Sequence, residues 1–298
     1  MQVFLMCQVE HMNYGYQPNF TRCVLRRFLT WIVHLLRLNN GTTLLATELA
    51  QILRPINTVN TKYGDVLIVA TNGRLKWRAN TMLSQEPEII DWIDASMDGK
   101  SIFLDVGANI GLYSLYALKR GVKYAYCCDL DFMNLSLLYQ NLVINSVQDR
   151  ALILPFAASS KLKLGKIYYR DLSEGDALQS INRPSPFSTH HGLLPHKLTQ
   201  ILYPLDDMFR SLELTMPTHI KIDVDGNEID TLAGMHNILN ACHELYMEYS
   251  LEIYDESEEC RGLLFDLGFR ECTRFPIYKV NLSVPDYEVL GYNIIYKR

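Results

Sequence analysis

The sequence lacks a run of apolar residues long enough to cross a membrane. A spanning helix needs about 20 consecutive apolar residues, and the most apolar N-terminal stretch is shorter, because Arg27 and Arg37 bound it. A signal peptide is not expected either, since Glu10 and His11 fall where its apolar core would continue. We therefore predict a cytoplasmic protein. The Arg-flanked stretch is expected to form a helix that packs on the protein's own core or on a second copy in a homodimer, with peripheral membrane contact as the alternative.

The sequence also lacks the cysteine spacings of metal sites and an excess of positive charge. The seven cysteines show no CxxC or Cys/His spacing, so we predict no metal site, and Cys127 and Cys128 are interpreted as reduced, buried thiols. Acidic residues outnumber basic ones, 33 to 28, for a net charge of −5. Nothing in this balance favours nucleic acid as a partner. A small-molecule or glycan acceptor is the expected partner.

Two common phosphate-binding motifs are absent from a glycine-rich stretch, FLDVGANIGLYSLYALKRG, that starts at Phe103. It contains neither GxxxxGK nor GxGxxG, which argues against nucleoside triphosphates and dinucleotides. Its pattern predicts a strand, a tight turn and a helix. Asp105 just before the turn suits a cationic ligand, and S-adenosylmethionine carries a sulfonium and an ammonium. The predicted cofactor-binding residues here are Asp105, Gly107, Ala108, Asn109 and Gly111.

The ends of the next two predicted strands support the same ligand. Asp129 and Leu130 end the second strand, and an acidic residue about 20 positions beyond a glycine turn binds ribose hydroxyls in sheets of this kind. Phe156 and Ala157 follow the third strand and are predicted to line the adenine. A strand-terminal aspartate can also simply cap the next helix, but three signals on successive strand ends strengthen the cofactor hypothesis.

Strand and helix patterns alternate from Ser101 onward, which predicts a mostly parallel sheet with helices on both faces. We expect a helical extension over residues 1–60 and a catalytic domain over 61–298. Residues 159–203 interrupt the alternation and are interpreted as an insertion with a lid loop, in which GKIYYRD is a strand. Near the start of the domain, Asn72-Gly73 is predicted to be the turn of a β-hairpin.

Several of these motifs resemble the FkbM family of S-adenosylmethionine-dependent methyltransferases. The resemblance runs from about residue 83 to the C-terminus and rests on FLDVGANIGLYSLYA, NLSLLYQNLVIN, PFAAS, PLDDMF and HIKIDVDGNEIDTLAGMHNIL. It implies a class I (Rossmann-like) α/β fold, with a seven-stranded sheet whose last strand is antiparallel. It also implies O-methylation of a hydroxyl, often on a sugar or polyketide-like product. Family members usually carry Glu-Pro where this chain has Asp129-Leu130.

The predicted function is therefore methyl transfer to a hydroxyl of a carbohydrate, glycolipid or related natural product. Transfer to nitrogen is one alternative, and a non-catalytic interaction module on the same fold is another. An alcohol needs a base to lose its proton, and the candidates are Asp223, Asp225 and Glu228 at one strand end and His191 in the lid loop. Asp225 and Glu228 could instead only shape the turn and cap the following helix, and His191 could be a plain surface residue. Glu248 is a further substrate contact to consider.

Overall fold

The computed structural model describes residues 54–170, 172–184, 196–250, 257–279 and 288–298, together with residues 24, 27, 28 and 30–32, which are helical. The chain divides into two compact units, Met1–Val59 with Leu67–Thr81, and Asn60–Val66 with Met82–Arg298. The remainder of the predicted N-terminal extension up to residue 53, most of the predicted lid loop and its His191 lie outside the described residues. None of the helices in the described ranges combines the length and the apolarity of a membrane span.

A two-stranded sheet and a helix precede the main fold. Strands β1 (Ile56–Thr61) and β2 (Gly64–Val69) pair, and helix α4 (Gly73–Thr81) follows. The prediction of a hairpin turn at Asn72-Gly73 is wrong, because Asn72 and Gly73 lie at the start of α4. The asparagine caps the helix, with the Leu75 amide donating to Asn72 Oδ1 at 2.9 Å. The connection between β1 and β2 instead runs into Gly64, whose φ is 96°.

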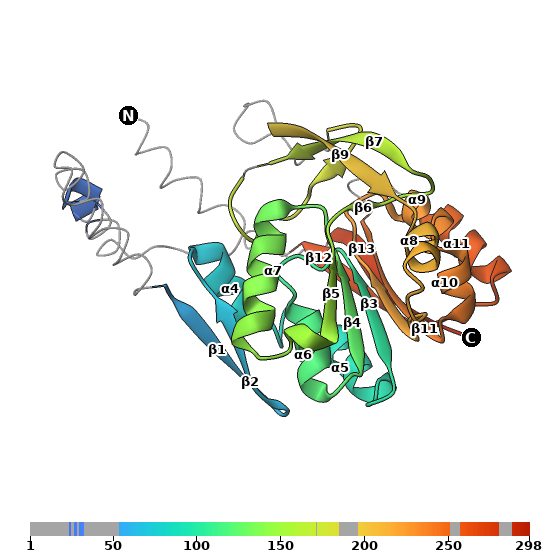
Figure 1. The fold of residues 1–298 in the computed structure, drawn as a ribbon, viewed down its shortest axis with the longest axis horizontal. Coiled ribbons are helices and arrows are strands. Elements are labelled where there is room, and N and C mark those ends of the chain that lie inside the picture. Colours follow the sequence, from blue (N-terminus) through green and yellow to red (C-terminus); the bar gives the residue numbers. More distant parts are fainter. Residues whose placement is uncertain are drawn as a thin grey trace. The chain divides into compact units, whose positions relative to one another are not determined.

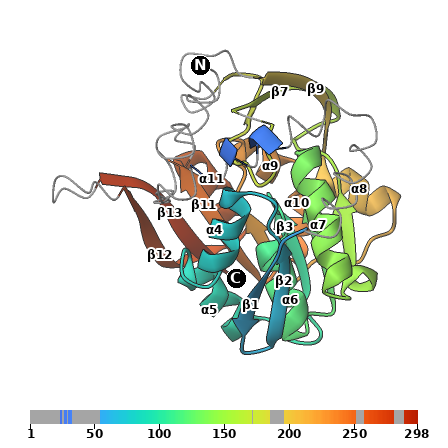
Figure 2. The same cartoon turned by 90° about the vertical axis from the view of Figure 1, so that its left-hand side faces the viewer.

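The main sheet has seven strands in the order β12-β13-β11-β10-β3-β4-β5 (Figure 1). Strand β13 is antiparallel to both of its neighbours, and the other pairings are parallel, which confirms the predicted class I sheet. The bounds of the strands are β3 Ile102–Val106, β4 Tyr124–Cys128, β5 Ala151–Leu154, β10 His219–Ile222, β11 Glu244–Ser250, β12 Arg270–Lys279 and β13 Glu288–Lys297. Figure 2 shows β12 and β13 at one edge of this sheet. The strand order reverses between β3 and β10, which is where open α/β sheets bind ligands.

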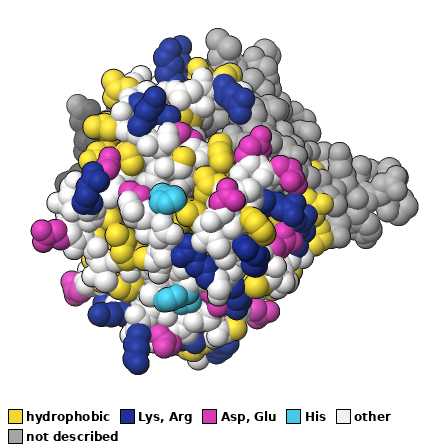
Figure 3. Space-filling view, turned by 90° about the vertical axis from the view of Figure 1, so that its right-hand side faces the viewer, with side chains coloured by type: hydrophobic (Ala, Val, Ile, Leu, Met, Phe, Trp, Pro, Cys, Tyr) yellow, Lys and Arg dark blue, Asp and Glu magenta, His cyan; other side chains and the backbone are white. Residues whose placement is uncertain are grey.

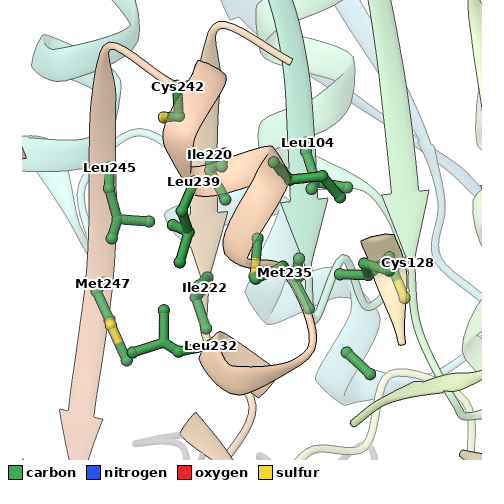
Figure 4. Packing of buried hydrophobic residues seen from close by; sticks show 14 of the residues in the cluster. Leu104, Cys128, Ile220, Ile222, Leu232, Met235, Leu239, Cys242, Leu245 and Met247 are labelled. Atoms are coloured by element: carbon green, nitrogen blue, oxygen red, sulfur yellow. The ribbon is translucent and has the colours of Figure 1, made fainter. Parts of the chain in front are cut away.

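Helices lie on both faces of this sheet because successive strand residues point to opposite sides. Leu104 and Ile222 belong to a buried cluster with Leu232, Leu239 and Met247, which Figure 4 shows between the strands and the short helices. The helices on this face are α8 (Leu205–Ser211), α9 (Glu228–Ala233), α10 (His236–Ala241) and α11 (Ser257–Asp266). The opposite face is covered by α5 (Pro87–Ser96) and α6 (Leu112–Arg120).

Between β4 and β5 the chain forms α7 (Phe132–Ile144) and a short 3-10 helix, η1 (Gln148–Arg150). Asp131 caps α7, since its side chain accepts from the Met133 amide at 2.8 Å. The carboxyl end of β4 therefore leads directly into a capped helix, so Asp129 and Asp131 are held close together at the edge of the sheet where ligands bind.

Most of a second sheet lies in the predicted insertion, residues 159–203, and its first strand lies just before that range. Its strands are β6 (Ala157–Ala158), β7 (Lys163–Tyr169), β8 (Ser180–Ile181) and β9 (His196–Tyr203), in the order β6-β9-β7-β8. Strand β7 confirms the predicted strand, but β8 and β9 were not predicted. The sequence of β9 does not show the alternation of apolar and polar residues that predicts a strand. The reason is that its buried face carries a polar residue, Gln200, whose side-chain amide donates to the Tyr169 hydroxyl.

Candidate active site

The glycine turn after β3 is packed tightly against the neighbouring strand ends. Gly107 has a φ of 82°, and its amide donates to the carbonyl oxygen of Cys128 at 2.9 Å. A Cβ on Gly107 would lie 1.7 Å from the carbonyl oxygen of Asp223, so only glycine fits here. A neighbouring backbone, and not only a ligand, therefore explains the small residue. Gly111, at a φ of 84°, begins α6, and a Cβ there would lie 3.0 Å from Leu138 Cδ1.

Asp129, at the end of β4, is tied to the same turn. Its two carboxylate oxygens each accept one backbone hydrogen bond, Oδ2 from the Asn109 amide at 2.7 Å and Oδ1 from the Asp131 amide at 2.8 Å. Burial raises the pKa of Asp129 to about 6, although these two amides oppose the shift. A carboxylate oxygen can accept more than one hydrogen bond. Asp129 can therefore hold the turn and still accept from a ribose hydroxyl.

Asp105 is a buried carboxylate with one unsatisfied oxygen. Its Oδ2 accepts from the Ser114 hydroxyl at 2.6 Å, whereas its Oδ1 has no hydrogen-bond partner and lies 3.6 Å from the Lys221 ammonium. Burial raises the pKa of Asp105, and the Lys221 charge opposes this. A buried carboxylate oxygen without a hydrogen bond is costly unless a donor reaches it. Asp105 beside the glycine turn, with Asp129 near it, therefore fits a ligand with an ammonium group and a ribose, as S-adenosylmethionine has.

The residues predicted to line the adenine lie where the second sheet meets the first. Ala157 belongs to a buried apolar cluster with Ile167, Tyr169 and Leu202, and Leu130 packs against it. Phe156 is buried in the main core, with its ring 5.7 Å from that of Tyr203. The second sheet thus covers the carboxyl ends of β4 and β5. Contact of these residues with adenine stays a prediction.

A strap formed by residues 175–179, between β7 and β8, crosses the strand ends. The side-chain amides of Asn109 and Asn134 both donate to the carbonyl oxygen of Asp176, at 2.8 and 3.0 Å. The Leu178 amide donates to Asp225 Oδ2 at 2.8 Å, and the side chain of Gln179 donates to Asp131 Oδ2 at 2.9 Å. Strap contacts therefore reach the loops after β3, β4 and β10.

One ion pair anchors the strap from its own sheet. The carboxylate of Asp176 is fully buried and pairs with the guanidinium of Arg170, which is also buried. Breaking such a buried pair from one side is expensive, because a charge is left without its partner. The strap is therefore a built part of the fold at this site.

Of the three predicted catalytic carboxylates, only Asp223 has a hydrogen bond to Lys221. Its Oδ2 lies 3.0 Å from the Lys221 ammonium. Asp225 adopts a φ of 52° and accepts from the strap. Glu228 is buried, and its Oε1 accepts from the Gly226 amide at 2.9 Å. Both side chains are thus bonded to backbone amides in or near this turn, and a catalytic role for either stays a prediction.

Lys221 is a buried cation between two aspartates. It is 2% exposed, and the register of β10 and β3 places it beside Asp105. Burial disfavours its charged form, but the carboxylates of Asp223 and Asp105 outweigh this and raise the pKa of Lys221. The ammonium therefore stays charged, linking the predicted cofactor side of the site to the predicted acceptor side.

Glu86, Tyr113 and Glu248 also lie at this edge, and the sequence pattern gave none of them a catalytic role. The three carboxyl groups of Glu86, Asp223 and Glu248 are called the acid cluster here. The Tyr113 hydroxyl, on α6, donates to the carboxylate of Glu86 just before α5. Burial first, and then the charge of Asp223, raises the pKa of Glu86 and raises that of Glu248 well above its usual range. Glu86 lies in none of the motifs described above. Tyr113 lies in the glycine-rich stretch that starts at Phe103, but its helical spacing gave no catalytic signal, and Glu248 carries only the signal of a polar residue near a strand end.

Comparison with known proteins gives the following matches. The sequence profile of the family described as Methyltransferase FkbM domain matches residues 105–271. The hexuronic acid methyltransferase AglP of Haloferax volcanii is 23% identical over 175 residues, which make up 58% of this chain and 65% of that protein. The chain thus spans less than two thirds of the length of this curated relative.

Two solved structures are also similar. The methyltransferase FkbM from Methylobacillus flagellatus KT is 15% identical, with a TM-score of 0.40, and the match covers 76% of this chain and 55% of that chain. TrmK of M. capricolum, in complex with S-adenosyl-homocysteine, is 12% identical, with a TM-score of 0.43, and the match covers 72% of this chain and 69% of that chain.

Proposed function

The chain belongs to the FkbM family of S-adenosylmethionine-dependent methyltransferases, and from this premise we propose that it methylates a hydroxyl oxygen of a carbohydrate or glycolipid. The observation that carries the proposal is the acid cluster of Glu86, Asp223 and Glu248 beside the glycine turn, with Lys221 and Tyr113 among them. Carboxylates accept hydrogen bonds from hydroxyls, and a carboxyl group of raised pKa can also donate one. Such a set suits a ligand with several hydroxyls.

The cofactor would be held by the residues of the turn and the neighbouring strand ends. Asp105 would accept from its ammonium, Asp129 would accept from its ribose, and the backbone from Gly107 to Gly111 would lie beneath it. When bound, S-adenosylmethionine supplies an electrophilic methyl group. The contacts described for Asp105 and Asp129 support this assignment. One carboxylate oxygen of Asp105 accepts no hydrogen bond, and the oxygens of Asp129 can each accept a further one.

Asp223 is the base in this proposal. An alcohol is too weakly acidic to ionise at neutral pH, so a carboxylate within hydrogen-bond reach must take its proton during transfer. Lys221 holds Asp223 from one side at 3.0 Å, which fixes the direction in which the carboxylate meets an acceptor. Glu86 and Glu248 hold their own protons more tightly than usual, so they would position neighbouring hydroxyls.

The protonation of the cluster suits an acceptor with several hydroxyls. Glu86 and Glu248 have raised pKa values and can donate hydrogen bonds when protonated, while Asp223 accepts one. The relative from Haloferax volcanii is named for hexuronic acid, which supports a sugar acceptor for this chain. The acidic balance of the whole chain supports a glycan or small molecule over nucleic acid.

The test is methyl transfer by the purified full chain to a panel of neutral sugars, uronic acids and glycolipids, with the product identified by mass spectrometry. Asp223→Asn should lower kcat about 10²- to 10⁴-fold and leave S-adenosylhomocysteine binding intact. Asp266→Asn, an exposed change on α11, is the matched control. Normal turnover by Asp223→Asn would refute the role of this base. A product that is an ester or an N-methyl compound would refute O-methylation of a hydroxyl.

A further inference from the structure

The second sheet has an outer face that nothing in the described part of the chain covers. We propose that this face, defined here as Leu162, Leu164, Lys166, Lys197 and Ile201, binds the surface of a membrane that contains anionic lipids. The proposal goes beyond methyl transfer and concerns where the protein works.

Strand pairing places these side chains on one side of the sheet. In the register of β7 and β9, Leu164 pairs with Ile201, Lys166 pairs with Thr199, and Tyr168 pairs with Lys197. Side chains alternate along each strand. The intervening residues Ile167 and Leu202 therefore point the other way, into the buried cluster beside Ala157 and Leu130. One face of the sheet thus covers the strand ends, and the other points away from them.

The apolar residues of the outer face are far more exposed than a core-forming sheet would leave them. Leu164 is 72% exposed, Leu162 62% and Ile201 54%. A single exposed leucine needs no explanation, but neighbouring ones on paired strands form a patch. Leu164 and Ile201 are direct cross-strand neighbours, and Leu162 lies just before β7.

Charge points to an anionic partner. Strands β6 to β9 carry three lysines and one histidine and no aspartate or glutamate, in a chain whose net charge is −5. Lys166 and Lys197 are exposed on the outer face, while Lys163 is paired with Asp230. Figure 1 places β7 and β9 at the top of the view, and at the same height in Figure 3 dark blue and yellow side chains lie among white atoms.

The combination fits a lipid surface better than a second copy of the chain. Leucine and isoleucine side chains enter the boundary between headgroups and acyl chains, and lysines beside them reach the lipid phosphates. Two copies joined through this face would bring lysines toward lysines, which is repulsive. An anionic bilayer offers both the apolar region and the opposite charge.

The lysines set the size of the expected effect. Each lysine near an anionic surface contributes about 1 kcal/mol, which is about fivefold in affinity. Reversing the charge of Lys166 and Lys197 should therefore weaken vesicle binding by at least about 25-fold. Removing apolar contact through Leu164→Ser with Ile201→Ser should weaken it as well, without changing the response to salt.

The experiment is co-sedimentation of the full chain with vesicles of phosphatidylcholine alone, or mixed with phosphatidylglycerol. We expect salt-sensitive binding to the mixed vesicles only, and its loss in Lys166→Glu with Lys197→Glu. The control is Lys100→Glu with Lys123→Glu, two exposed lysines at the other end of the main sheet, which should bind like the wild type. Thermal unfolding of each variant shows that the fold is kept. No acceptor is used, so the result is independent of the proposed methyl transfer.

Several results would overturn the proposal. Binding to no vesicle, or equal binding to both kinds, would exclude an anionic surface as the partner. Binding that both pairs of variants on the face leave unchanged would assign it to another part of the chain. A wild type that is dimeric by light scattering, and becomes monomeric in Leu164→Ser with Ile201→Ser, would show that a second copy covers the face.

Discussion

Gly107 tests whether packing or ligand contact requires the small residue after β3. In Gly107→Ala the new Cβ would lie 1.7 Å from the carbonyl oxygen of Asp223, whereas ordinary contacts begin at 3.4 Å. Both partners are backbone at the ends of paired strands, so neither can rotate away. Separating them also weakens the hydrogen bonds from the Gly107 amide to Cys128, at 2.9 Å, and from the Asp223 amide to Val106, at 3.0 Å.

The magnitude follows from three contributions. A left-handed backbone costs a residue with a Cβ about 1–2 kcal/mol. Overpacking costs about 1–3 kcal/mol, and each weakened hydrogen bond about 1 kcal/mol. We therefore expect Gly107→Ala to lower the free energy of unfolding by about 4 kcal/mol or more. The free energy of unfolding of most domains is roughly 5–15 kcal/mol, so this loss is a large part of it.

Gly121 provides the matched control. It ends α6 with a φ of 109°, and a Cβ there would meet nothing within 4 Å. Gly121→Ala should therefore cost only the backbone contribution, about 1–2 kcal/mol. The measurement is urea unfolding of both variants and the wild type, followed by circular dichroism in the absence of cofactor. If Gly107→Ala costs no more than Gly121→Ala, the close approach to Asp223 is not what requires glycine.

Three further changes test the site. The pKa of Asp129 is raised to about 6 in the folded state, so the folded protein keeps a proton that the unfolded chain loses at lower pH. The free energy of unfolding should therefore fall by about 2–3 kcal/mol as the pH rises from 4 to 7. Asp129→Asn should remove that part of the slope in denaturation curves, and an unchanged slope would contradict the shift. Lys221→Met leaves two aspartates without their cation and should cost about 3–5 kcal/mol in urea unfolding; a cost below about 1 kcal/mol would contradict a buried pair. Asp225→Ala removes the acceptor of the Leu178 amide and so loosens the strap that crosses the strand ends of the site. Substrate binding should weaken, with KM about fivefold higher and kcat little changed. A large loss of kcat would instead make Asp225 catalytic.

Local sequence patterns were sufficient for most of the main sheet. Strand and helix patterns predicted strands β3, β4 and β5 and the strand β10 that Asp223 follows, because each pattern is set by burial against the two faces. The errors have local causes. Asn72-Gly73 suits both a hairpin turn and a helix cap, and the polar Gln200 on a buried face hides β9.

The sequence by itself determined the class of sheet, the glycine turn with its flanking Asp105, and Asp129 on the next strand end, since each depends on residues close together in the chain. Only the tertiary structure decided that Glu86 and Glu248 lie close enough for the charge of Asp223 to raise their pKa values, while Asp225 bonds to a strap from the insertion. Strand order brings these residues together, and strand order is set by how helices pack on both faces. Local periodicity does not encode that packing, so the acid cluster could be recognised only in the folded chain.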